Sequence, residues 1–237
     1  MKAASPTIRG RLDEVRGRIA RAAERAGRRP ESVVLVGVVK TVPEGIIREA
    51  VALGLGELGE SRVQEAEAHI AAVGRDTARW HMIGHLQRNK AGRAVELFDR
   101  VHGVDSADLA QALSRRAVAA GCRLPVLVEV NVSGEAAKFG AAPEALVGLL
   151  ERVAGLPGLA LDGLMTVGAR VERAEDARAG FARLRMLRDQ GERVLGMRLP
   201  ELSMGMSGDF EVAVEEGATM VRVGSALFGE RPGPGRD

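Results

Sequence analysis

Lys40 is the residue of this chain whose setting most clearly suggests chemistry. It directly follows the apolar run 33–39, which is typical of a buried β-strand. An amine at the carboxyl end of such a strand is partly desolvated, so its pKa falls and its neutral form can react with an aldehyde to give a Schiff base. A lysine that simply extends its amine into solvent fits the same pattern equally well.

Two turns near the end of the chain could hold an anion. Each follows a short apolar run and is rich in serine and glycine, and their candidate ligands are Ser203, Ser207, Gly224 and Ser225. Backbone N–H groups and hydroxyls that converge in such turns bind phosphate. One turn of this kind is more often an ordinary helix N-cap, but two of them after neighbouring strands strengthen the phosphate interpretation.

Two polar side chains alternate with apolar residues along predicted strands. Arg222 lies between two valines, so it points to the interior of the fold if those valines pack against helices. A buried guanidinium needs a ligand or a carboxylate partner, and Glu129 is the candidate partner. Asn131 belongs to a polar row in the strand 126–132 and is a further candidate ligand contact, although a plain hydrogen-bonding role is the commoner one.

Other patterns in the sequence do not indicate a site. The segment 54–59 matches G-x-G-x-x-G, but it follows residues of helical period instead of a strand, so a dinucleotide cofactor is not implied. His81 and His85 have no spaced third ligand that would favour zinc. Cys122 is the only cysteine, which excludes an intrachain disulfide and a multi-cysteine metal site. We predict no metal site.

The elements that position these residues alternate along the chain. After a first helix, eight apolar runs are separated by segments of helical period. The runs are 33–39, 56–58, 80–83, 101–104, 126–132, 159–166, 201–204 and 220–223. Eight such repeats in this length favour an α/β fold, a single (β/α)8 TIM barrel with an extra N-terminal helix, over an open sheet. We expect an amphipathic helix packed on the barrel at 1–29, the barrel at 30–229 and a mobile tail at 230–237.

The composition is that of a soluble globular protein. The chain has 237 residues, of which 46% are hydrophobic and 28% charged, and a formal net charge of +2. The first 30 residues are strongly basic, which would also suit a nucleic-acid-binding helix, but they lack aromatic residues that could stack on bases. Because no targeting signal or membrane-spanning run is apparent, we expect a cytoplasmic monomer or weak dimer that binds neither nucleic acid nor membrane.

Seven motifs along the chain share their order and spacing with one known family. They are 38–41, 59–65, 80–90, 129–133, 164–165, 202–207 and 220–224, the last followed by Phe228-Gly229. Through them the chain resembles the pyridoxal phosphate homeostasis proteins, single-domain barrels of fold type III related to the N-terminal domain of alanine racemase. The resemblance implies that Lys40 carries pyridoxal 5'-phosphate (PLP) as a Schiff base. It also implies that the four turn residues surround the phosphate and that Arg222 faces the pyridine nitrogen.

The resemblance further implies a function in intracellular PLP homeostasis and in the supply of PLP to apoenzymes. An arginine at the pyridine nitrogen disfavours protonation of that nitrogen and so weakens the electron sink of the cofactor. The related racemases share this arginine but add a second domain and a catalytic tyrosine, and this chain contains no tyrosine. We therefore expect a PLP-binding protein with no catalytic residues and little or no turnover. The alternatives are a phosphorylated-metabolite TIM-barrel enzyme, a PLP-dependent amino-acid racemase and a nucleic-acid-binding module.

Overall fold

The strands of the computed structural model, which describes residues 7–135, 138–169 and 171–229, close into one parallel barrel. They are β1 (Val34–Val38), β2 (Glu57–Glu60), β3 (Arg79–Met82), β4 (Arg100–Val104), β5 (Leu124–Glu129), β6 (Leu159–Met165), β7 (Glu201–Ser203) and β8 (Met220–Val223). They follow one another around the barrel in sequence order, and β8 pairs with β1 to close it. The predicted (β/α)8 fold is therefore confirmed.

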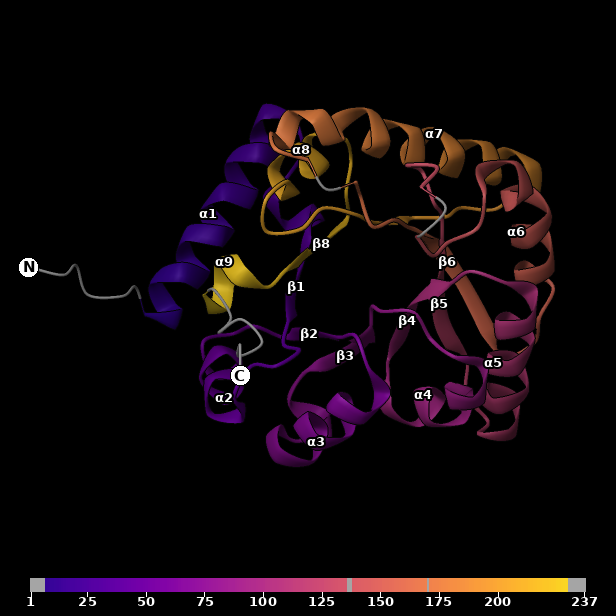
Figure 1. Cartoon of the computed structure of the whole chain (residues 1–237), viewed down its shortest axis with the longest axis horizontal. Helices are drawn as coiled ribbons and strands as arrows, with labels where there is room; N and C mark the ends of the chain where they lie inside the picture. Colours follow the sequence, from indigo (N-terminus) through magenta and orange to yellow (C-terminus); the bar gives the residue numbers. More distant parts are fainter. Residues whose placement is uncertain (1–6, 136–137, 170, 230–237) are drawn as a thin grey trace, which may run out of the picture.

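Helices form a ring outside the barrel (Figure 1). The α-helices are α1 (Ile8–Arg25), α2 (Glu44–Ala52), α3 (Val63–Val73), α4 (Ala91–Leu97), α5 (Ala107–Ala119), α6 (Leu146–Ala154), α7 (Arg178–Leu195), α8 (Phe210–Glu215) and α9 (Ser225–Phe228). Short 3-10 helices lie at η1 (Pro30–Ser32), η2 (Arg75–Thr77), η3 (Arg88–Lys90), η4 (Pro143–Ala145) and η5 (Ala174–Ala177). A search of the described residues finds no helix that could cross a membrane.

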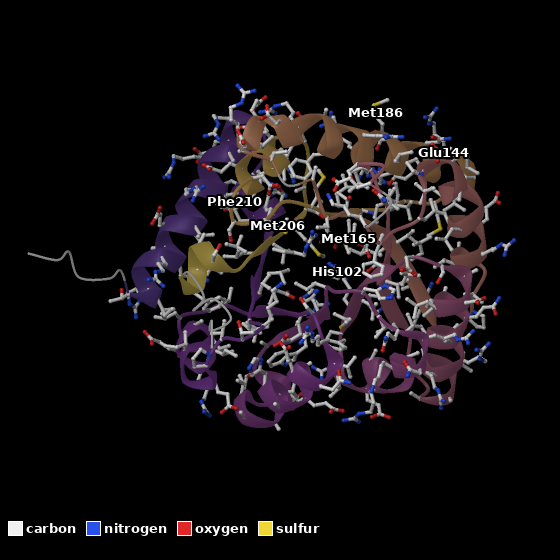
Figure 2. All side chains as sticks on the ribbon, viewed as in Figure 1. His102, Glu144, Met165, Met186, Met206 and Phe210 are labelled. Atoms are coloured by element: carbon white, nitrogen blue, oxygen red, sulfur yellow. The ribbon has the colours of Figure 1, made fainter. Side chains whose placement is uncertain are left out.

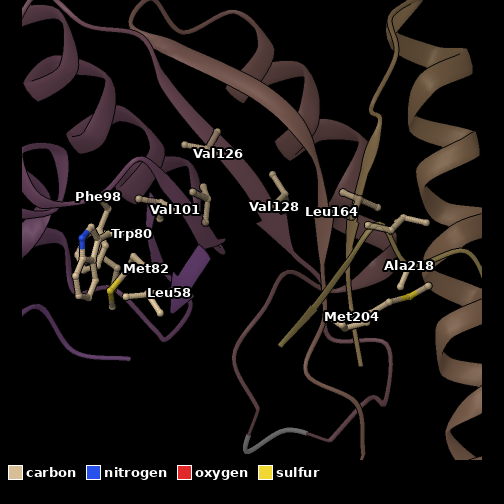
Figure 3. Close-up of a cluster of buried hydrophobic side chains, with 14 of the residues drawn as sticks. Leu58, Trp80, Met82, Phe98, Val101, Val126, Val128, Leu164, Met204 and Ala218 are labelled. Carbon is tan, nitrogen blue, oxygen red and sulfur yellow. The ribbon is translucent and has the colours of Figure 1, made fainter. Parts of the chain in front are cut away.

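The main hydrophobic core lies between the strands and this ring of helices (Figure 3). Alternate strand residues such as Leu58, Trp80 and Leu164 are fully buried in it. The helices supply apolar residues at spacings of three and four, as in Leu146, Leu149, Leu150 and Val153 of α6. Each such side chain stabilises the fold by roughly 1.5–3 kcal/mol when it is fully buried.

The interior of the barrel forms a second, different layer. Six apolar residues are buried but do not belong to the core under the helices, and these are Val36, Val38, Ile83, Leu127, Met165 and Met220. Three buried polar side chains also lie in this interior. The rings of His81 and His102 contact each other, and His102 and Arg222 both contact the hydroxyl of Ser203. Because Val36 and Val38 face inward, the even-numbered set of the first strand, which leads to Lys40, is the set that lines the barrel.

The basic N-terminal helix α1 packs on the barrel instead of standing alone. Its apolar face, including Leu12, Val15 and Ile19, is buried, and Figure 1 shows it beside α8 and α9. Its basic face pairs partly with α8, where Arg18 lies 2.7 Å from Glu211. Residues 1–6 and the predicted mobile tail at 230–237 lie outside the described residues.

Candidate functional site

The turn after β1 fixes Lys40 at the carboxyl rim of the barrel. The backbone N–H of Val39 still pairs with Gly59 on β2 at 3.0 Å, so Lys40 is the first residue beyond the sheet. Thr41 then adopts a φ of 62°, a left-handed conformation that is rare for a β-branched residue. Backbone strain of this kind is found preferentially at functional positions. The turn leaves the side chain of Lys40 half-buried at the mouth of the barrel.

The two glycine- and serine-rich turns are joined by the hydroxyl of Ser207. Its oxygen accepts hydrogen bonds from the backbone N–H groups of Gly224 and Ala226, each at 3.2 Å. The backbone N–H of Arg222 also donates to the carbonyl of Gly205 at 3.0 Å. The structure therefore brings the turns after β7 and β8 together, as the sequence predicted, and one of them begins the short helix α9 at Ser225.

This pair of turns has the donors that a phosphate requires. Because the Ser207 oxygen already accepts two N–H groups, its own proton is available to an anion. Among the described residues, the backbone N–H groups of Ser207, Gly208 and Ser225 make no hydrogen bond to a protein acceptor. The hydroxyl of Ser225 is exposed at the same place. Together these groups are hydrogen-bond donors that meet at one end of the barrel, while the carboxylate of Asp209 in the turn after β7 accepts from the backbone N–H of Met206 at 2.6 Å.

Arg222 lies inside the barrel, directly below this rim. One guanidinium nitrogen donates to the Ser203 hydroxyl at 2.6 Å and the other donates to the Thr166 carbonyl at 2.8 Å. Burial lowers the pKa of Arg222 to about 10, against the opposing charges of Glu129 and Asp209. The guanidinium thus stays charged at neutral pH. The inward direction of Arg222 is confirmed, but the predicted partner Glu129 acts on it through charge, while its hydrogen bonds go to two other residues.

Glu129 is a buried carboxyl at the end of β5. Burial raises its pKa to about 7; the charge of Arg222 opposes this rise and that of Asp105 adds to it. A group with this pKa is partly protonated at neutral pH, so it can hold or release a proton at the mouth of the barrel. From the sequence, Glu129 was predicted only as an ion-pair partner, because its burial is a property of the closed barrel.

The predicted ligand Asn131 makes hydrogen bonds within the loop that follows β5. Its amide nitrogen donates to the carbonyl of Glu135 at 2.8 Å, and its amide oxygen accepts hydrogen bonds from Ser133 and Gly134 at 3.1 Å each. Both ends of the amide are therefore used to fold the loop after β5. These contacts support the plain hydrogen-bonding role that was the alternative, and a contact of Asn131 with a ligand stays a prediction.

The predicted phosphate ligand Ser203 also lies elsewhere. It is the last residue of β7 and is fully buried in the barrel interior, where its hydroxyl contacts the ring of His102 at 2.9 Å and the guanidinium of Arg222. With both of these partners, Ser203 supports Arg222 from below instead of joining the turns above. Of the four predicted turn residues, the structure brings together Ser207, Gly224 and Ser225.

Sequence reasoning missed the histidines in the barrel interior. His81 was interpreted as a packed residue and His102 was not considered, yet their ring nitrogens lie 2.9 Å apart, and both rings are buried. The position of His102 two residues after Arg100, on one face of β4, was the available signal. The search of the described residues finds no group of side chains that could hold a metal ion.

Comparison with known proteins places this geometry in a family. The profile of the family "Alanine racemase, N-terminal domain" matches residues 11–232. The pyridoxal phosphate homeostasis protein of Aquifex aeolicus is 46% identical over 221 residues, which is 93% of this chain and 97% of that protein. The protein of the same name from Pseudomonas aeruginosa is also 46% identical, over 95% of this chain and 96% of its own.

Solved structures agree with these sequence matches. PipY of Synechococcus elongatus, whose structure has PLP bound, superposes with a TM-score of 0.83 at 38% identity, covering 94% of this chain and all of that one (100%). Alanine racemase of Clostridium difficile is only 18% identical, and its TM-score of 0.73, over 98% of this chain and 60% of that one, shows a shared fold alone. From these matches, which span nearly its whole length, we conclude that the chain belongs to the pyridoxal phosphate homeostasis protein family.

Proposed function

We propose that this protein binds PLP as a Schiff base on Lys40 and serves intracellular PLP homeostasis and the supply of PLP to apoenzymes. The observation that carries the proposal is the placement of three groups around one barrel mouth. They are the half-buried amine of Lys40, the buried cation of Arg222 and the anion-binding donors of the two turns. An aldehyde, a pyridine nitrogen and a phosphate are the three matching groups of PLP.

Each group of the cofactor has a residue of suitable chemistry in this site. The phosphate would accept hydrogen bonds from the hydroxyls and backbone N–H groups of Ser207 and Ser225. It would lie beside Gly224, whose own N–H is held by Ser207. The charged guanidinium of Arg222 would donate to the ring nitrogen, since it is held by the Ser203 hydroxyl and the Thr166 carbonyl. When bound, PLP supplies an aldehyde that reacts with a primary amine, and Lys40 is the amine at this rim.

The state of Arg222 favours holding PLP over using it in catalysis. Its pKa of about 10 keeps the guanidinium positive at neutral pH. A positive donor at the pyridine nitrogen disfavours protonation of that nitrogen, and an unprotonated ring is a poor acceptor for carbanion electrons. The chain also contains no tyrosine that could serve as an opposing acid or base. We therefore propose little or no turnover, with at most a weak PLP-dependent side activity.

We further propose that PLP-dependent apoenzymes receive the cofactor at this rim, and that the protein works in the cytoplasm as a monomer or weak dimer. Three exposed hydrophobic side chains support the rim as a contact surface. Phe139, Val167 and Met206 follow β5, β6 and β7, and all three are on loops at the end of the barrel where the cofactor would leave. Figure 2 labels Met206 among them.

Absorbance of the purified protein tests the proposal. Protein incubated with PLP and freed of excess cofactor should show a visible absorption band that disappears on borohydride reduction. Lys40→Ala should lack the band. Lys138→Ala is the matched control, because Lys138 lies at the same rim, where its amine contacts Glu135 at 2.7 Å and the Gly168 carbonyl at 3.1 Å. It should keep the band.

Two outcomes would contradict the proposal in different ways. A colourless wild-type protein that cannot be reconstituted with PLP would favour an enzyme acting on a phosphorylated metabolite. Rapid racemisation or transamination of common amino acids, lost in Lys40→Ala, would show that the protein is a catalyst and not mainly a carrier.

A further inference from the structure

Four polar residues link Arg222 to the opposite end of the barrel. Below Arg222, the Ser203 hydroxyl lies 2.9 Å from Nδ1 of His102, and Nε2 of His102 lies 2.9 Å from Nδ1 of His81. Nε2 of His81 is 2.5 Å from a carboxylate oxygen of Glu57. Glu57 is the first residue of β2, whereas Lys40 follows the end of β1. Because the strands are parallel, this chain of hydrogen bonds runs from the cofactor rim to the amino end of the barrel.

Burial isolates the chain everywhere except at its far end. Relative exposure is 4% for Arg222, 0% for Ser203, 0% for His102 and 1% for His81, while the side chain of Glu57 is 23% exposed. Figure 2 shows His102 near the middle of the barrel. Since buried polar groups must be hydrogen-bonded to one another, each of these residues limits the proton position of the next.

The end groups of the chain determine the direction of every hydrogen bond. A guanidinium only donates, so the Ser203 oxygen accepts from Arg222. Among the described residues, Nδ1 of His102 is the one acceptor within reach of the Ser203 proton, so a buried Ser203 is satisfied when it donates there. Burial, with the charges of His81, Arg222 and Arg100, lowers the pKa of His102 well below its usual value. A neutral His102 that accepts at Nδ1 carries its proton on Nε2. It donates this proton to Nδ1 of His81.

His81 repeats the same pattern at the next step. Because its Nδ1 accepts from His102, its proton lies on Nε2 and is donated to Glu57. All hydrogen bonds therefore point from the cation Arg222 to the carboxylate of Glu57. Such a chain has the cation at one end and the carboxylate at the other.

We propose that Glu57, His81, His102 and Ser203 form a one-way hydrogen-bond chain that holds Arg222 in position, which makes Glu57 a remote positioning residue for the cofactor. The role toward the cofactor rests on the proposed function, since it requires that Arg222 face the PLP ring. The chain itself does not depend on bound PLP. It can therefore be tested separately.

Other charged groups next to the chain define its boundaries. The charges of Glu129 on β5 and Asp209 before α8 raise the pKa of Arg222 from the side of the rim. Arg100 acts on His102 from the same strand but has its own partners, Asp162 at 2.9 Å and Glu201 at 3.2 Å. Arg79 lies 3.9 Å from Glu57 at the far end. Asp162 is thus a half-buried carboxylate in the same interior that lies outside the chain, and it provides a matched control.

Histidine tautomers measured by long-range ¹H–¹⁵N NMR on PLP-free protein at pH 7 test the direction of the chain. The protein contains four histidines, so the variants His69→Gln and His85→Gln identify by exclusion the two signals that belong to His81 and His102. Both of these should be neutral, with the proton on Nε2. A proton on Nδ1 of either ring, or a doubly protonated ring, would overturn the proposal even if PLP binds as expected.

Variants at the far end test the role of the chain in positioning Arg222. We expect PLP to bind about tenfold more weakly to His102→Leu and about threefold more weakly to Glu57→Gln. In both variants the midpoint pH of the visible band of bound PLP should shift by about half a unit or more. Asp162→Asn should match the wild type in both measurements.

The outcomes separate the two proposals. If Glu57→Gln changes thermal stability but leaves affinity and the spectral midpoint like those of Asp162→Asn, the positioning role is wrong and Glu57 is merely structural. If the wild-type protein does not bind PLP at all, the proposed function fails, while the NMR result still decides whether the chain exists.

Discussion

The two buried layers of this barrel have opposite characters. The layer under the helices is almost entirely apolar, with residues such as Leu58, Trp80 and Leu164. The interior instead contains His102, Arg222 and other polar groups that are bonded in specific pairs. Apolar packing depends mainly on shape and volume, whereas a buried polar network fails if one partner is missing. Most of the apolar packing that stabilises the fold thus lies between the strands and the helices, whereas the polar groups suited to binding lie inside the barrel.

Two neighbouring residues of β6 give the largest contrast between the layers. Leu164 faces the helices and Met165 faces the interior. We expect Leu164→Ala to lower the free energy of unfolding by about 2–5 kcal/mol because it leaves a cavity, with the PLP affinity of the folded protein unchanged. Met165→Leu, which keeps the volume, should cost less than about 1.5 kcal/mol but alter PLP binding. Urea denaturation measures the stability of both variants, and PLP titration measures their affinity. Equal effects of the two substitutions on affinity would contradict the proposed difference between the layers.

Loss of the Ser207 hydroxyl should affect binding much more than folding. Ser207 connects the two turns and would donate to the phosphate. Since a hydrogen bond to a charged group contributes about 1.5–3 kcal/mol, Ser207→Ala should bind PLP about 10- to 100-fold more weakly in an equilibrium titration. The control is Ser106→Ala, which removes the N-cap of α5 after β4. If the control loses as much affinity as Ser207→Ala, the turns after β7 and β8 are not the phosphate site.

Glu129 should make the stability of the PLP-free protein depend on pH. Its folded pKa of about 7 lies above the ordinary value of 4.5, so the folded protein binds an extra proton between these values. The stabilising contribution is complete below pH 4.5 and is lost as the pH rises through 7, by at most about 1.4 kcal/mol per pH unit. The free energy of unfolding of Glu129→Gln, taken relative to that of the wild type, should therefore be higher at pH 8 than at pH 5. Parallel denaturation curves with no pH-dependent difference would show that this carboxyl is not perturbed.

The smallest effect on folding is expected at the exposed rim. Phe139→Ser removes an exposed ring that stacks on His85 at a centroid distance of 3.8 Å. We expect a stability change within about 0.5 kcal/mol and unchanged PLP affinity, but slower activation of a PLP-dependent apoenzyme. Met186→Ser, an exposed position on α7 away from the rim, is the control. Identical rates of apoenzyme activation with both variants would show that Phe139 at the rim does not contact the apoenzyme.

The sequence predicted the outer layer and the rim better than the interior. Period-2 and helical patterns located all eight strands, and the glycine- and serine-rich turns were correctly placed together. These features are local, so a single segment contains the signal. The ion pair between the basic face of α1 and Glu211 could not be predicted, because it joins residues far apart in the sequence.

The interior was harder to predict because its pairs depend on strand register. The hydrogen-bond chain from Glu57 to Arg222 joins five strands, and the sequence of each strand does not show which residues lie opposite one another. The register also shifts between β5 and β6 after Val126. As a result, Asp162 and Met165 both face inward although they are three residues apart. The contact between Ser203 and Arg222 was missed for the same reason, since only the closed barrel brings the two side chains together.

The central claim is that Lys40 carries the cofactor, and it can be tested directly by mapping the site of attachment. Protein loaded with PLP would be reduced with borohydride, digested, and analysed by peptide mass spectrometry. The account predicts the phosphopyridoxyl group on Lys40, at the end of β1. Stoichiometric labelling of Lys2, Lys90 or Lys138 with Lys40 unmodified, or no labelling of a protein that still binds PLP, would contradict it.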